Sequence, residues 1–145
     1  KKQDSLIKKY AITSIPREIN FKRSGNKFSL NNYYGNIIDL DFSHFFNYDL
    51  VFKDYEIISK KVKIFIIRNL TKENIENEKF MARFIFFVDV LYENKNILSL
   101  SSEMELDRVK VKNINSFDFK RTVSRLKEMR SGEYIKDNLK LVFKR

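Results

Sequence analysis

The chain has 145 residues, of which 43% are hydrophobic, with a formal net charge of +10 and no cysteine. This length is sufficient to bury one core, and the lack of cysteine excludes disulfides and thiolate metal sites. No apolar run approaches the ~20 residues that a membrane-spanning helix needs.

The positive charge is concentrated at the two ends of the chain. Residues 1–27 carry +6 and residues 116–145 carry +5, whereas residues 28–59 carry −4. A basic segment suits an anionic partner such as a nucleotide, a nucleic acid or a lipid head group, although an ordinary solvated surface has the same pattern. We interpret residues 1–16 as a basic lead-in, a tail or short helix, and residues 17–145 as a single β-rich domain.

The first elements predicted along the domain are strands. Residues 17–23 alternate apolar and polar side chains and stop at Ser24-Gly25-Asn26, which is typical turn chemistry. Residues 36–43 alternate in the same way, with isoleucine, leucine and phenylalanine on one side and aspartate on the other. Residues 48–57 form a third predicted strand.

Two later segments are apolar on both faces, residues 61–69 and residues 80–92. Such segments are typical of strands that are covered on both sides, and we predict both as strands. Residues 97–112 return to an alternating pattern whose phase changes near Asp107, which indicates a bulge or a bend.

The period then changes to that of a helix. Ser116 is a suitable N-cap, and Phe119, Val123 and Leu126 follow at i, i+4 and i+7. Residues 133–145 fit either a second helix or a strand, and we favour the helix. The predicted fold is therefore α+β, an antiparallel sheet of about six strands curled into a small barrel, with one or two C-terminal helices.

Side chains for catalysis are scarce. His44 is the single histidine, which excludes a histidine-rich metal site. Asp39 with Asp41, and Glu103 with Glu105, place two carboxylates on one strand face, a pattern that serves metal binding or acid–base chemistry but is more typical of the wet face of a half-buried strand.

The glycines also argue against a nucleotide-binding loop. They stand at positions 25, 35 and 132, and a phosphate-cradling loop needs several glycines close together. We therefore predict that the protein is not an enzyme, and we predict no catalytic residue, no metal site and no cofactor.

Six predicted strands followed by an amphipathic helix are the layout of the PilZ domain, the β-barrel receptor for cyclic di-GMP. Residues 36–43 resemble the second strand of that family, which ends in a D/N-x-S-x-x-G motif. Asp41 and Ser43 match its first two positions, and Phe46 replaces the glycine at the third. The resemblance implies a non-enzymatic, cytoplasmic module that docks a partner protein or, as a second choice, cyclic di-GMP.

The family's R-x-x-x-R motif, which clamps the messenger, is absent here. Basic residues without that spacing stand in its place, and an anionic ligand would draw on them together with the strand end. The ligand-binding residues that the resemblance implies are Lys8, Lys9, Arg17, Arg23, Asp41 and Ser43.

Two other functions remain open. The succession of strand, turn at residues 93–96, strand and basic helix resembles the periplasmic assembly lipoproteins of the LptE kind, which implies a lipid-anchored accessory protein of the bacterial envelope. The positive charge also keeps open an RNA-associated or ribosome-associated protein, although no RNA-reading motif is recognisable.

The two doubly apolar segments also predict an interface. They need cover on both faces, whereas the chain offers one clear helix and one ambiguous segment. An exposed apolar patch marks an interaction site, so we predict a homo-oligomer or a protein complex. The predicted contact residues are Phe65, Ile67, Ile85 and Phe87.

Overall fold

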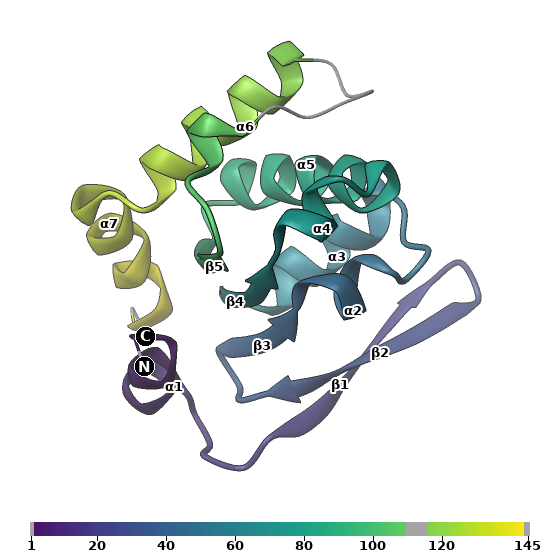
Figure 1. The fold of residues 1–145 in the computed structure, drawn as a ribbon. Coiled ribbons are helices and arrows are strands. Elements are labelled where there is room, and N and C mark those ends of the chain that lie inside the picture. Colours follow the sequence, from purple (N-terminus) through teal and green to yellow (C-terminus); the bar gives the residue numbers. More distant parts are fainter. Residues whose placement is uncertain (1, 110–115, 144–145) are drawn as a thin grey trace.

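The computed structural model describes residues 2–109 and 116–143 (Figure 1). In chain order its elements are α1 (Lys2–Tyr10), β1 (Arg17–Arg23), β2 (Asn26–Tyr33), β3 (Ile37–Asp41), α2 (Phe42–Phe46), α3 (Phe52–Lys61), β4 (Ile64–Leu70), α4 (Lys72–Ile75), α5 (Glu78–Glu93), β5 (Ile97–Ser102), a 3₁₀ turn (Leu106–Arg108), α6 (Ser116–Met129) and α7 (Gly132–Phe143). The basic lead-in thus begins with a helix.

The five strands of the described chain form one sheet in the order β1-β2-β3-β4-β5. β1, β2 and β3 pair antiparallel, whereas β3, β4 and β5 pair parallel. Each parallel connection passes through helices, because a chain that returns to the same end of a sheet needs a crossover. The predicted antiparallel barrel of about six strands is therefore wrong, and the sheet is mixed and open.

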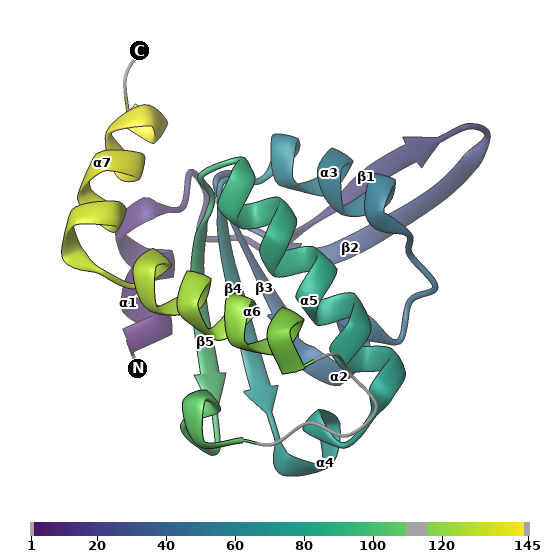
Figure 2. The same ribbon diagram turned by 90° about the horizontal axis from the view of Figure 1, so that it is seen from above.

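Helices cover the two faces of the sheet unequally (Figures 1 and 2). The larger core lies between the sheet and α2, α3 and α5, and α6 packs on the outside of α5. A smaller cluster on the other face has Ile37, Ile64, Ile66 and Ile97 at its centre, covered by side chains of α1 and by Leu139 of α7. The sheet is thus buried on both faces at one end of its parallel strands.

The predicted strand at residues 80–92 is helix α5. Its buried side chains recur at helical spacing, as Met81, Phe84, Val88 and Leu91 show. The helix lies between the sheet and α6, so it is apolar on nearly all sides and lacks the polar stripe that would reveal its period. Its start is marked by Asn77, whose side chain accepts a hydrogen bond from the backbone N–H of Phe80 (3.1 Å).

Two further differences concern residues 26–33 and 48–57. Residues 48–57 were predicted as a strand, but residues 52–57 belong to helix α3, whose first turn is held by a hydrogen bond from the Val51 N–H to the Asp54 carboxylate (2.8 Å). The first segment was not predicted as an element and forms β2, which pairs with β1 across the turn at Ser24-Gly25. β2 has three asparagines and a lysine among its eight residues and buries Leu30, so its pairing with β1 rather than its composition makes it a strand.

The other strand and helix predictions agree with the structure. The predicted ranges 17–23 and 36–43 contain β1 and β3, the range 61–69 covers all of β4 except Leu70, and α6 begins at the predicted Ser116. The predicted strand at 97–112 ends at Ser102, and its residues 110–112 lie outside the described part of the chain. The favoured second helix is α7, and residues 144–145 of that prediction likewise lie outside it.

Candidate functional site

The carboxyl ends of β3, β4 and β5 carry a polar cluster on the face that α1 and α7 cover. The alignment of residues between the neighbouring strands explains the position of this polar cluster. Ile37, Ile64 and Ile97 are aligned at the amino ends of the three strands, whereas Asp41 is aligned with Arg68 four residues farther along. One face of the parallel sheet is therefore apolar at the amino ends of its strands and charged at their carboxyl ends. The charged end is of interest because open α/β sheets bind ligands outside the carboxyl ends of their strands.

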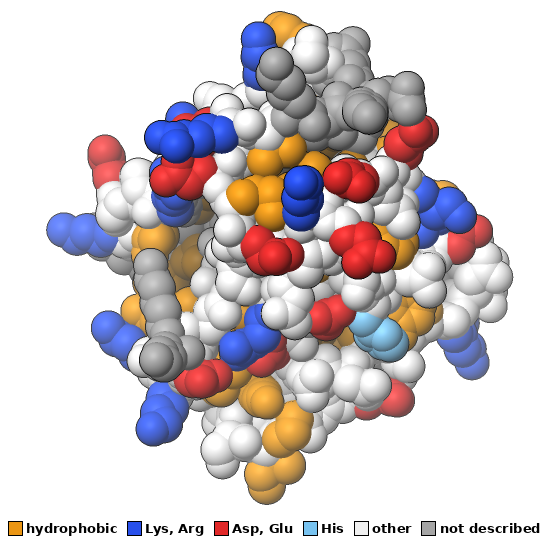
Figure 3. Space-filling view, in the orientation of Figure 1, with side chains coloured by type: hydrophobic (Ala, Val, Ile, Leu, Met, Phe, Trp, Pro, Cys, Tyr) orange, Lys and Arg blue, Asp and Glu red, His pale blue; other side chains and the backbone are white. Residues whose placement is uncertain are grey.

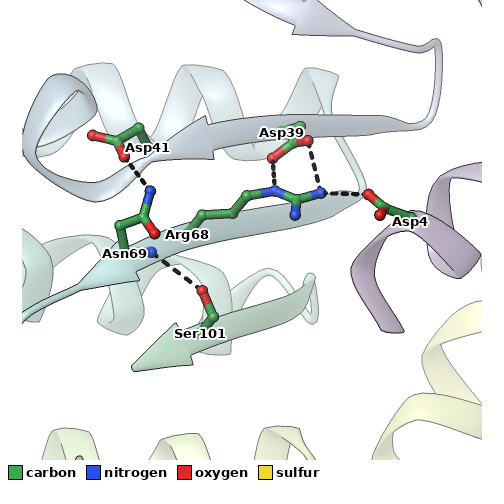
Figure 4. A network of polar contacts seen from close by, with 6 residues as sticks. All are labelled: Asp4, Asp39, Asp41, Arg68, Asn69 and Ser101. Atoms are coloured by element: carbon green, nitrogen blue, oxygen red, sulfur yellow. Dashed lines mark hydrogen bonds and ion pairs between the residues drawn. The ribbon is translucent and has the colours of Figure 1, made fainter. Parts of the chain in front are cut away.

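Arg68 of β4 is the centre of the cluster (Figure 4). Its Nε and Nη2 donate to the two carboxylate oxygens of Asp39, at 2.8 and 3.0 Å, and Nη2 also donates to Asp4 of α1 at 3.1 Å. The hydrogen bond to Asp39 raises the pKa of Arg68, and the hydrogen bond from Arg68 lowers the pKa of Asp4. The two hydrogen bonds to Asp39 thus join β4 to β3, and the hydrogen bond to Asp4 joins β4 to α1.

Asp41 ends β3 and caps α2. Its carboxylate accepts hydrogen bonds from the Asn69 amide (2.7 Å), the Ser43 hydroxyl (3.0 Å) and the His44 N–H (3.2 Å). Partial burial raises the pKa of Asp41, but these hydrogen bonds outweigh it and the pKa lies below its usual value of 3.8. Asp41 therefore stays ionised at neutral pH. Its carboxylate joins the end of β3 to the first turn of α2 and to the end of β4.

Asn69 follows Arg68 and has a left-handed backbone, with φ of +67°. Its N–H donates to the Ser101 hydroxyl of β5 (3.2 Å), and its carbonyl oxygen accepts from the Asn74 amide (3.0 Å). Asparagine tolerates this conformation better than most residues, and here it lets the chain leave β4 at an irregularity in the β4–β5 register.

The lowered pKa of Asp41 predicts an acid-sensitive contribution to stability. Because its pKa is lower in the folded state, ionised Asp41 stabilises the fold above about pH 4, and this stability is lost as pH falls through the folded-state pKa. Asp41→Asn should lower the unfolding free energy at neutral pH and flatten its decline in acid, measured by urea unfolding across that range. Ser43→Ala, which removes one donor, should act in the same direction but less strongly. Coincident acid limbs for wild type and Asp41→Asn would contradict this role.

The structure does not assemble the six predicted ligand-binding residues into one site. Only Asp41 and Ser43 are in contact, and both serve the N-terminus of α2. Arg23 pairs with the buried Asp54. Lys8 and Lys9 lie on α1 and Arg17 opens β1, and no hydrogen bond or ion pair found among the described residues joins these three side chains to the others. Their role in anion binding stays a prediction.

The four predicted contact residues lie inside the domain. Phe65, Ile67, Ile85 and Phe87 are all buried in the larger core. The side chains that cover them come from α2, α3, α5 and α6 of the same chain, because the segments expected to be strands supply the missing helices. These four positions therefore form no exposed apolar patch, and a protein partner or homo-oligomer stays a prediction.

The other acidic candidates have structural partners. Glu103 accepts a hydrogen bond from the Lys72 N–H (3.2 Å), and Glu105 forms an ion pair with Arg108 (3.1 Å). His44 is exposed (pale blue in Figure 3). Within residues 2–109 and 116–143, no three His, Asp or Glu side chains are grouped to hold a metal ion, and no helix is long and apolar enough to cross a membrane.

Sequence reasoning missed Arg68, Asn69 and Ser101. Arg68 and Asn69 stand at the end of the predicted strand 61–69, which is the available signal, whereas Ser101 stands early in the predicted strand 97–112 and carries no such signal. The signal becomes meaningful only once β3, β4 and β5 are known to run parallel, because antiparallel neighbours would place these residues at opposite edges of the sheet.

A cavity of about 690 Å³ runs along the outer side of β5. Side chains from α1, α6 and α7 line it, and most of them are apolar, such as Leu100, Leu126 and Leu139. An ion pair between Lys127 and Asp107 (3.4 Å) stands among its lining residues. Its chemistry suits apolar groups rather than phosphate.

Comparison with known proteins points to an ATPase family. The family described as AFG1-like ATPase matches residues 7–138, about nine-tenths of the chain. The uncharacterized protein C115.02c of Schizosaccharomyces pombe is 34% identical over 56 residues, which cover 39% of this chain and 12% of that protein. The chain thus matches only about an eighth of that relative's length. No solved structure matches the chain significantly.

This match corrects the function inferred from the sequence pattern. The resemblances to PilZ domains and to LptE-like lipoproteins were wrong, as were the expectations of a non-enzymatic module and of an RNA-associated protein, because the family that matches the chain is described as AFG1-like ATPase. The D-x-S pattern that suggested PilZ is here the N-cap of α2, where Asp41 accepts from His44. The chain belongs to the AFG1-like ATPase family.

Proposed function

We propose that the protein containing this chain hydrolyses ATP and that this chain supplies a supporting domain of the enzyme. The family match over residues 7–138 carries this proposal. The glycines at 25, 35 and 132 form no G-x-x-x-x-G-K-[ST] loop, in which backbone N–H groups hold the phosphates. In our proposal that loop belongs to another part of the protein, in keeping with the much longer S. pombe relative.

Within the enzyme, we assign the Arg68 cluster a positioning role. The cluster contains the carboxylates of Asp4, Asp39 and Asp41 and a single guanidinium, so its net charge disfavours direct binding of a triphosphate. Its hydrogen bonds instead hold the carboxyl ends of β3, β4 and β5 together. A rigid sheet end of this kind supports a neighbouring nucleotide site by keeping its geometry constant.

The test is ATP hydrolysis by the full-length protein. We expect Mg²⁺-dependent release of inorganic phosphate that saturates with ATP. Arg68→Ala should lower turnover by at least about tenfold, because displacing a positioning group by ~1 Å costs up to ~100-fold in rate. Arg108→Ala is the matched control, since its side chain is 83% exposed and forms an ion pair with the nearby Glu105, and it should leave turnover unchanged.

The outcomes separate the two parts of the proposal. A folded full-length protein that releases no phosphate would overturn the ATPase assignment. Equal turnover in wild type and Arg68→Ala would leave that assignment intact and remove the positioning role of Arg68. Full recovery in Arg68→Lys would indicate that charge alone suffices and that the two-point contact with Asp39 does not matter.

A further inference from the structure

The β1–β2 hairpin forms a two-stranded ribbon that extends past the end of α3 (Figure 2). Its turn, Ser24-Gly25, has positive φ at both residues, 46° and 87°. Such turns match the twist of the flanking strands and fix their register. The ribbon is therefore a defined protrusion rather than a loop.

The two faces of the ribbon differ in chemistry. One face carries Phe21 and Phe28, whose rings stack with centroids 5.1 Å apart, and Leu30; Phe21 and Leu30 are 2% and 3% exposed. On the other face Lys22 stands directly opposite Lys27, and both side chains are exposed. This outer face points away from the core that holds the rings.

Two lysines in directly opposite positions repel each other, which is unfavourable for an isolated ribbon. Among the described residues, no carboxylate forms an ion pair with Lys22, Lys27 or the neighbouring Lys61 of α3. Lys61 donates to the Asn20 carbonyl (3.4 Å) and its ammonium lies 5.4 Å from the centroid of the Phe21 ring, so it lies beside β1 on the inner face of the ribbon and the outer face has Lys22 and Lys27 alone as its lysines. On the face of the molecule that Figure 3 shows, acidic and basic side chains are interspersed, whereas Lys22 and Lys27 place two positive charges side by side.

The rest of the outer face is polar and mostly neutral. Asn20 lies opposite Ser29 on the same side as the lysines, and exposed Asn31 follows along β2. Amide and hydroxyl groups of this kind, together with lysine, are the groups that contact phosphate and sugar in nucleic-acid complexes. Glu18, at the far end of β1, is the acidic residue of this strand.

We propose that the outer face of the β1–β2 ribbon binds the phosphate backbone of a DNA duplex, with Lys22 and Lys27 as the main contacts. A two-stranded ribbon fits the major groove of a duplex. Single strands need exposed aromatic rings for base stacking, and here Phe21 is buried. A lipid surface needs apolar side chains at the tip, which consists of Ser24, Gly25 and Asn26. This inference goes beyond ATP hydrolysis and does not depend on it.

The test is binding of a fluorescent DNA duplex of mixed sequence to the full-length protein without nucleotide, over ~50 to ~200 mM salt. Each phosphate contact contributes about 0.9 to the slope of log affinity against log salt. The double variant Lys22→Gln/Lys27→Gln should reduce the slope by about 1.8, so its loss of affinity across this range should be roughly tenfold smaller than that of wild type. Lys22→Arg/Lys27→Arg keeps the charge and should restore the slope.

The matched control is Lys8→Gln/Lys9→Gln, which removes the same charge from exposed positions on α1, at the opposite end of the molecule (Figure 2). It should leave the slope unchanged. An equal reduction in both double variants would mean that overall charge, and not the ribbon, binds DNA. Absence of duplex binding at ~50 mM salt, or tighter binding to phosphatidylserine vesicles than to the duplex, would also overturn the proposal.

Discussion

Phe87→Ala should lower the free energy of unfolding by about 3–5 kcal/mol, the usual cost of removing a fully buried phenylalanine. Phe87 is 0% exposed and lies at the centre of an aromatic cluster. Its ring centroid is 5.3 Å from those of Phe45 and Phe65, 5.6 Å from that of Phe46 and 5.7 Å from that of Tyr55. All four contacts are edge to face, so the substitution loses favourable ring geometry in addition to buried area.

The neighbouring Phe86 is a matched control on the same helix. Its side chain is 47% exposed and contacts Phe52 at a centroid distance of 6.3 Å. Phe86→Ala should therefore cost less than about 1 kcal/mol. Chemical unfolding followed by circular dichroism measures both variants. Similar losses in the two would show that α5 does not present Phe87 to the core as described.

A second large effect is expected at Asn96, which precedes β5 and is 1% exposed. Its side-chain amide donates to the carbonyl oxygens of Ser59 and Val62, both at 2.9 Å. Ser59 lies in the last turn of α3, where backbone carbonyls lack partners within the helix. Asn96→Ala would leave two buried acceptors unsatisfied, at about 1–3 kcal/mol each, so we expect a loss of about 2–5 kcal/mol.

Asn94 supplies the comparison. It is exposed and donates through its side chain to the Ser59 hydroxyl at 2.7 Å. Asn94→Ala should cost about 1 kcal/mol or less, because water can replace the lost partner. Thermal unfolding of both variants tests the difference. A loss at Asn96 no greater than that at Asn94 would mean that water reaches the end of α3 and that Asn96 does not cap it.

Local patterns predicted those elements whose burial is one-sided. Alternation identified β1 and β3, and the spacing of Phe119, Val123 and Leu126 identified α6. In each of these elements polar residues mark the exposed side, so the period is visible in the sequence. The absence of a Gly-rich phosphate-binding loop from this chain can likewise be read from the sequence alone. Membership of an ATPase family could not be read from any single motif and came from the family match over most of the chain.

Tertiary structure decided the elements that are covered on both sides and the site that depends on them. α5 is apolar nearly all round because it packs between the sheet and α6, and such a segment carries no period that separates helix from strand. Once α3 and α5 are helices, they form crossovers that make β3, β4 and β5 parallel. Parallel pairing then brings Asp39 and Arg68, 29 residues apart in sequence, to the same sheet edge. The pairing of strands depends on residues far apart in the sequence and on burial of the whole sheet, so no short stretch of sequence determines which strands pair.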